Sequence, residues 1–76
     1  MLSKSAIVWG QNRCKYCDLA IKHLENLGVN VTYYKIGVNV TENDFYSKFP
    51  GVRSVPQIEI DGKHIGGYTE LLSASI

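Results

Sequence analysis

The sequence predicts one small α/β domain with the element order β-α-β-α-β-β-α, in which a four-stranded mixed sheet carries helices on both faces. Three observations predict it: an apolar run that ends at Gly10, an amphipathic stretch behind that run, and a hairpin signal at Asp61-Gly62. The chain has 76 residues, of which 45% are hydrophobic. This is enough for one compact core and too short for a second domain, so we expect residues 1–76 to form a single domain.

The first half of the chain has the pattern of a βαβ unit. Residues 6–9 (AIVW) are continuously apolar, as in a central strand that is covered on both faces. A helix is then indicated by apolar residues at helical spacing, which are Cys17, Ala20, Ile21, Leu24 and Leu27. Gly28 follows where a helix C-cap favours glycine. Residues 31–36 (VTYYKI) are β-branched, aromatic and partly polar, which suits a less buried strand parallel to the first.

A second helix is predicted to begin after Thr41, whose side chain is suited to an N-cap. Val40 and Phe45 have the spacing of a hydrophobic staple across that cap. Pro50 disfavours helical geometry at Phe49, so we expect the helix to end there.

The last third of the chain predicts a hairpin and a short helix. Residues 57–60 (QIEI) alternate with period two, and Asp61-Gly62 is a strong turn signal before residues 63–65. Two glycines then interrupt the pattern ahead of a helix over 69–74.

Charge and composition restrict the partners. Eight Lys and Arg against seven Asp and Glu give a net charge of +1, which provides no field for nucleic acid or an anionic membrane. No apolar run approaches the roughly 20 residues of a membrane span, and the first residues lack a signal-peptide core. We therefore expect a cytoplasmic protein, and we separately expect it to be a monomer.

The cysteine pair is the most informative feature. Cys14 and Cys17 lie where the first strand leads into the first helix. Free N–H groups and the dipole of a helix start favour an anion, and Arg13 and Lys15 add positive potential. Cys14 is thus the expected nucleophile. Cys17 lies one turn further on the core-facing stripe, so we expect it to be less exposed, less acidic and suited to resolve a mixed disulfide.

The same C-x-x-C spacing is also half of a zinc site, so zinc is an alternative. Two more ligands would be needed, and His23 and His64 are the histidines available in the sequence. His23 lies off the apolar stripe of its helix. We therefore expect no bound metal.

Val55-Pro56 stands immediately before the strand over 57–60. The proline either simply starts the strand or forms a cis peptide bond. A cis bond would expose the Val55 backbone beside Cys14, where it could pair with a substrate peptide in β fashion.

Three segments together resemble glutaredoxins: residues 14–17 (CKYC), 54–58 (SVPQI) and 61–68 (DGKHIGGY). The resemblance extends over nearly the whole chain. It implies a thioredoxin-like fold in which the first cysteine forms a mixed disulfide with glutathione.

Carried over by position, the resemblance implies a glutathione site formed by Arg13, Tyr16, Arg53, Val55, Pro56, Gly67, Thr69 and Glu70. Tyr16 would be a wall beside the sulfur, and the Val55 backbone would pair with the cysteine of glutathione. Thr69 and Glu70 fall where the family binds the γ-glutamyl end. Gln11 departs from the family's lysine, which meets the glycine carboxylate, so the two arginines are the candidates for that role.

The resulting interpretation is a glutathione-dependent thiol–disulfide oxidoreductase without a permanently bound cofactor. Cys14 attacks a disulfide, Cys17 releases the reduced substrate, and glutathione regenerates the dithiol. The resemblance implies ribonucleotide reductase or glutathionylated proteins as clients. Residues 51–56 and the short length are also similar to NrdH-redoxins, which thioredoxin reductase reduces. A non-catalytic module that binds zinc or an iron–sulfur cluster is the alternative of a different class.

Overall fold

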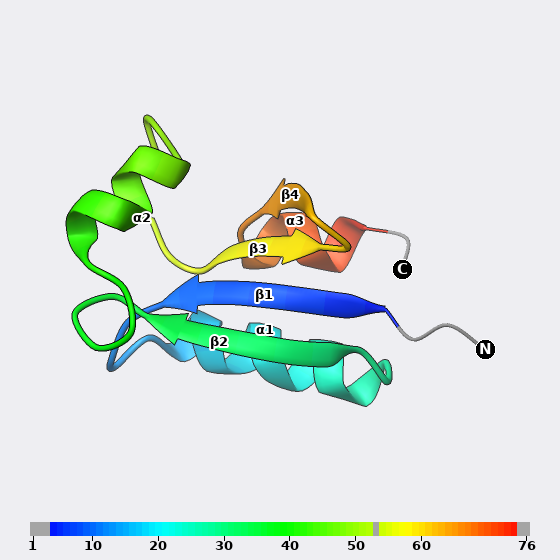
Figure 1. Cartoon of the computed structure of the whole chain (residues 1–76). Coiled ribbons are helices and arrows are strands. Elements are labelled where there is room, and N and C mark those ends of the chain that lie inside the picture. Colours follow the sequence, from blue (N-terminus) through cyan, green and yellow to red (C-terminus); the bar gives the residue numbers. More distant parts are fainter. Residues whose placement is uncertain (1–3, 53, 75–76) are drawn as a thin grey trace.

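The computed structural model describes residues 4–52 and 54–74, and its seven elements follow the predicted order (Figure 1). They are β1 (Ser5–Gly10), α1 (Lys15–Asn26), β2 (Asn30–Lys35), α2 (Glu42–Lys48), β3 (Gln57–Ile60), β4 (Lys63–Gly66) and α3 (Tyr68–Ser73). The four strands form one sheet in the order β2-β1-β3-β4. The predicted four-stranded mixed sheet is therefore confirmed.

β1 is one of the two inner strands of this sheet. It runs parallel to β2, from the pair Ser5 and Asn30 to the pair Gly10 and Lys35, and antiparallel to β3. Parallel neighbours need a crossover connection, which α1 provides. Residues 11–14 join the end of β1 to the start of α1, so the C-x-x-C segment lies at the end of the sheet where β1 finishes (Figure 1).

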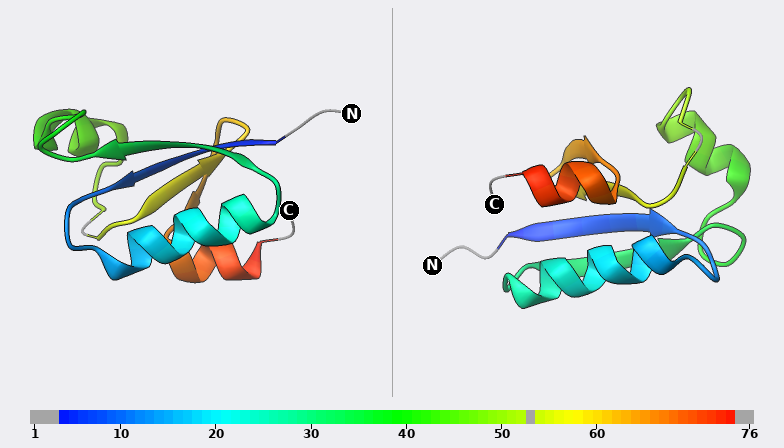
Figure 2. Two further views of the ribbon diagram at one scale, coloured as in Figure 1. Left: turned by 90° about the horizontal axis from the view of Figure 1, so that it is seen from below. Right: turned by 180° about the vertical axis from the view of Figure 1, so that it is seen from behind.

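Helices pack on both faces of the sheet, but they cover them unequally. α1 and α3 lie side by side on one face (Figure 2), over a core that includes Val8, Ile58 and Leu71. α2 lies at the end of the sheet, where its Phe45 and Phe49 pack with Trp9 in a separate cluster. Side chains alternate along a strand, so Val8 faces α1 and Trp9 faces α2. The second face is thus covered only near Trp9.

α1 has the caps that the sequence indicates. Cys14 is its N-cap, and Gly28 beyond its end has a φ of +78°, in the left-handed region that glycine adopts readily. The predicted apolar stripe is buried at Ala20 and Leu24. Leu27 does not belong to it, because the helix ends at Asn26 and the Leu27 side chain is 51% exposed.

α2 begins as predicted. The Thr41 hydroxyl oxygen accepts a hydrogen bond from the Asp44 backbone N–H at 3.0 Å, and Val40 packs against the cluster that contains Phe45. The helix ends with Phe49 as its C-cap. These contacts bring α2 close to the segment that precedes β3.

The hairpin turn has positive φ at both central residues, +51° at Asp61 and +84° at Gly62, which matches the right-handed twist of the strands. β4 is one residue longer than predicted, and α3 begins at Tyr68, one residue earlier than predicted. Within residues 4–52 and 54–74, no helix combines the length and apolarity needed to cross a membrane.

Candidate active site

Cys14 and Cys17 form a disulfide at the N-terminus of α1, with their Cα atoms 5.2 Å apart. The Sγ atom of Cys14 accepts a hydrogen bond from the Cys17 backbone N–H at 3.1 Å. Cys14 is partly exposed, whereas Cys17 is completely buried. This difference agrees with the expected exposure of the two sulfurs, and the Cys17 N–H of the helix start faces the outer one.

The inner sulfur lies against the end of β1. A Cβ atom added at Gly10 would be 2.5 Å from Cys17 Sγ and 2.8 Å from the Tyr33 hydroxyl oxygen. Burial, and to a lesser degree the Asp18 carboxylate, raise the pKa of Tyr33. The Tyr33 hydroxyl therefore stays protonated at neutral pH, and it donates a hydrogen bond to the Gln11 carbonyl at 3.4 Å.

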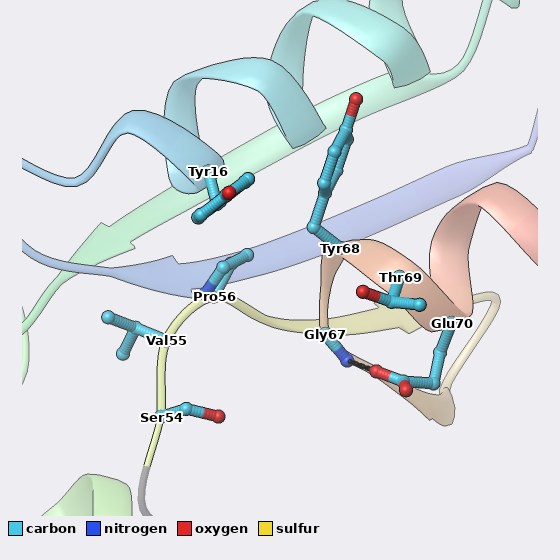
Figure 3. A pocket seen from close by; sticks show the side chains of 8 residues that line it. All are labelled: Tyr16, Ser54, Val55, Pro56, Gly67, Tyr68, Thr69 and Glu70. Carbon is cyan, nitrogen blue, oxygen red and sulfur yellow. Dashed lines mark hydrogen bonds between the residues drawn. The ribbon is translucent and has the colours of Figure 1, made fainter.

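A cavity of about 240 Å³ lies between three segments that are far apart in the sequence (Figure 3). Tyr16 comes from the first turn of α1, the residues around Val55 come from the segment before β3, and the remainder come from the start of α3. The lining residues are Tyr16, Ser54, Val55, Pro56, Gly67, Tyr68, Thr69 and Glu70. Six of the eight residues predicted for glutathione are thus together in one cavity. The Val55–Pro56 peptide bond is cis.

Aromatic side chains bound the upper part of the cavity as Figure 3 draws it. The rings of Tyr16 and Tyr68 have their centroids 5.7 Å apart, and Tyr16 is 58% exposed. Tyr68 and Ser54 were not among the predicted site residues. The signal was nevertheless present in the sequence, because each residue belongs to a segment that resembles glutaredoxins.

Glu70 has a structural function in addition to any role in binding. Its Oε1 atom accepts a hydrogen bond from the Gly67 backbone N–H at 2.7 Å, drawn as a dashed line in Figure 3. A Cβ atom at Gly67 would come within 3.2 Å of both this oxygen and the Pro56 carbonyl oxygen. Glycine therefore lets the start of α3 approach the cis-proline segment closely.

Of the two arginines predicted for this site, Arg13 does not line the cavity. Arg13 is exposed, has a φ of +58°, and is not one of the lining residues. Arg53 lies outside the described residues.

A second cavity of about 230 Å³ adjoins the first. It is lined by Gln11, Ile36, Glu42, Tyr46, Ser54 and Val55. Ser54 and Val55 line both cavities and form the wall between them. Gln11, which departs from the family pattern, thus lies beside the site.

The described residues contain no group of three or more His, Cys, Asp or Glu side chains placed to hold a metal ion. His64 instead approaches the Gln57 amide, with 2.7 Å between His64 Nε2 and Gln57 Oε1. Residues 4–52 and 54–74 therefore provide no complete set of ligands for the zinc alternative.

A disulfide-forming cysteine pair at a helix start, beside a cavity, has the arrangement for exchanging disulfides with other molecules. The protein is a thiol–disulfide oxidoreductase with a thioredoxin-like fold. The family model for glutaredoxin matches residues 2–65, and the chain belongs to the glutaredoxin family.

Individual relatives agree with this assignment. Glutaredoxin 1 of Escherichia coli is 36% identical over 72 residues, with 84% of each chain covered. The crystal structure of glutaredoxin 1 from Francisella tularensis complexed with cacodylate has a TM-score of 0.72 at 28% identity and covers 93% of this chain and 91% of its own. The buckwheat glutaredoxin–glutathione complex has a TM-score of 0.78 at 25% identity and covers 92% of this chain and 66% of its own.

Proposed function

We propose that the protein reduces disulfides through Cys14 and Cys17 and is itself reduced by glutathione. The Cys14 thiolate attacks a substrate disulfide, which forms a mixed disulfide and expels the first substrate thiolate. The Cys17 thiolate then attacks the Cys14 sulfur, which expels the second substrate thiolate and leaves the Cys14–Cys17 disulfide. Two electrons pass to the substrate, whose two thiolates take up protons from water.

Two molecules of glutathione return these electrons. The first attacks the Cys14 sulfur and forms a mixed disulfide with it, which releases the Cys17 thiol. The second attacks the glutathione sulfur of that mixed disulfide, which yields oxidised glutathione and the free Cys14 thiolate. Each cycle thus converts two glutathione molecules to one molecule of the disulfide.

The observation that carries this proposal is the cavity formed by Tyr16, the Val55-Pro56 segment and the start of α3. Its volume of about 240 Å³ offers room for part of a tripeptide. We propose that the Val55 backbone pairs with the glutathione cysteine and that Thr69 and Glu70 contact the γ-glutamyl end. The solved buckwheat relative, a glutaredoxin–glutathione complex, supports this assignment.

The electron source tests the proposal directly. Turnover of a small glutathione mixed disulfide is measured once with glutathione and glutathione reductase, and once with thioredoxin reductase alone. We expect turnover only in the first assay. Turnover with thioredoxin reductase alone would instead identify an NrdH-like redoxin.

Gln11→Lys is expected to lower the KM for glutathione about threefold to fivefold. Gln11 lines the second cavity, and a lysine there places a positive charge where the resemblance puts the glycine carboxylate of glutathione. An exposed charge pair of this kind contributes modestly to binding. The measurement is the glutathione dependence of turnover at low and high salt. Asn12→Lys is the matched control, because it adds the same charge at an exposed neighbour that lines neither cavity. An equal fall in KM for both variants would contradict a specific contact.

We further propose a reducing compartment, the cytoplasm, as the site of action, and a monomer as the active form. Ribonucleotide reductase and glutathionylated proteins are the proposed clients, and these rest on the resemblance alone.

A further inference from the structure

Gln57 is the buried polar side chain of the described core, with 5% of its surface exposed. It follows Pro56 directly, and both ends of its amide are bonded. The Nε2 group donates a hydrogen bond to the Ser54 carbonyl oxygen at 2.9 Å. The Oε1 atom lies 2.7 Å from His64 Nε2. An amide oxygen only accepts, so His64 Nε2 carries the proton in this contact.

His64 is held from a second side. Its ring packs on Phe49 with the centroids 4.5 Å apart, and Phe49 is the buried C-cap of α2. Both the cationic imidazole and one neutral tautomer have a proton on Nε2, so the contact with Gln57 is available in either form. The ring thus connects α2 and the β4 edge of the sheet to the Gln57 amide.

The hydrogen bond from Gln57 to the Ser54 carbonyl determines the direction in which the Val55 N–H points. Among the described residues the only cis peptide bond is Val55–Pro56, so the Ser54–Val55 bond is trans. In a trans peptide the C=O and N–H groups point in opposite directions. Because Gln57 holds the Ser54 oxygen, the Val55 N–H points away from Gln57. No acceptor in the described part of the chain receives that N–H.

We propose that Gln57 and His64 are positioning residues that orient the Val55 backbone for its hydrogen bond with the substrate. This inference rests on the proposed function, since it names the contacts that align the docking segment, which is residues 54–56. Ser54 and Val55 form the wall shared by the two cavities. Neither positioning residue lines those cavities, so each acts through the segment and not by touching the substrate.

The test uses the KM and kcat for a glutathione mixed disulfide. Gln57→Met keeps the length of the side chain and removes both contacts. It is expected to raise KM about tenfold and to leave kcat within about twofold, because a docking interaction is lost and the chemistry at Cys14 is untouched. His64→Phe keeps a ring on Phe49 but removes the donor, and about a threefold rise in KM is expected. The KM of the double variant should equal that of Gln57→Met, because His64 acts on the docking segment only through Gln57.

Glu59→Gln is the matched control. It changes the same strand and weakens the Lys48–Glu59 ion pair of 3.3 Å, but it does not touch the docking segment. Its KM should stay within about twofold of the wild type. An equal rise of KM in Glu59→Gln, or an unchanged KM in Gln57→Met, would overturn the positioning role.

Two further measurements separate this inference from the proposed function and from a folding defect. A parallel assay reduces a disulfide peptide with dithiothreitol in place of glutathione. Absence of wild-type turnover with glutathione alone contradicts the proposed function, whereas an unchanged KM of the variants in the peptide assay contradicts the positioning role. In NMR spectra, the Gln57 side-chain amide protons should exchange slowly with solvent and become faster in His64→Phe. Fast exchange in the wild type would overturn the inference even where Gln57→Met fails to fold.

Discussion

Cys14→Ser is expected to lower turnover of a glutathione mixed disulfide by about 10³-fold or more, while Cys17→Ser keeps glutathione-linked reduction. The Cys14 sulfur is the partly exposed one, and it accepts the Cys17 N–H at 3.1 Å, which favours the thiolate. A serine hydroxyl does not ionise at neutral pH and cannot form the mixed disulfide. Without Cys17, a second glutathione can still release the first from Cys14.

Steady-state turnover of both variants with glutathione and its reductase checks this assignment. The rate of reduction of a protein disulfide should also fall in Cys17→Ser, because Cys17 can no longer attack the mixed disulfide between Cys14 and the client. Alkylation of the reduced Cys17→Ser protein across a pH series gives a second measurement, in which Cys14 should react at lower pH than free cysteine. Equal activity of the two variants would show that the roles are assigned wrongly.

Gly10→Ala is expected to destabilise the protein by about 1 to 3 kcal/mol. The added Cβ atom would lie 2.5 Å from Cys17 Sγ, and the other close atoms belong to the Tyr33 ring and hydroxyl. The sulfur is buried and bonded to Cys14, so it has little freedom to move away. The structure must therefore shift around the inner sulfur, and closure of the Cys14–Cys17 disulfide should become slower.

Denaturant unfolding and the rate of disulfide closure measure these two effects. Gly62→Ala is the control: its φ of +84° also strains an alanine, but open space surrounds the position and the active site is distant. It should lose stability without any change in closure rate. An unchanged unfolding midpoint for Gly10→Ala would contradict the close contact.

Much of the fold could be predicted because its signals are local. The Thr41 cap, the apolar spacing of α1 and the Asp61-Gly62 turn each depend on neighbouring residues, and all three are present in the structure. The extent of the apolar face of α1 was less well predicted. Leu27 continues the apolar spacing but lies beyond the end of α1, where the chain turns at Gly28.

The site was predicted in part, because a motif identifies residues but not their neighbours in space. The C-x-x-C segment and the Val55-Pro56 segment were both identified from the sequence, with a cis bond as one of two alternatives for Pro56. Arg13 was included for its charge, but it does not line the cavity. Tyr68 was omitted, although its ring lies 5.7 Å from that of Tyr16.

The sequence by itself determined the chemistry: two thiols spaced one helical turn apart, at the point where a strand leads into a helix. The tertiary structure decided which segments enclose the cavity and which side chain holds the Ser54 carbonyl beside Val55. The physical reason is that exposure and side-chain pairing arise from packing between elements. The Gln57–His64 contact joins β3 to β4, and the His64 ring also packs on Phe49 from the end of α2.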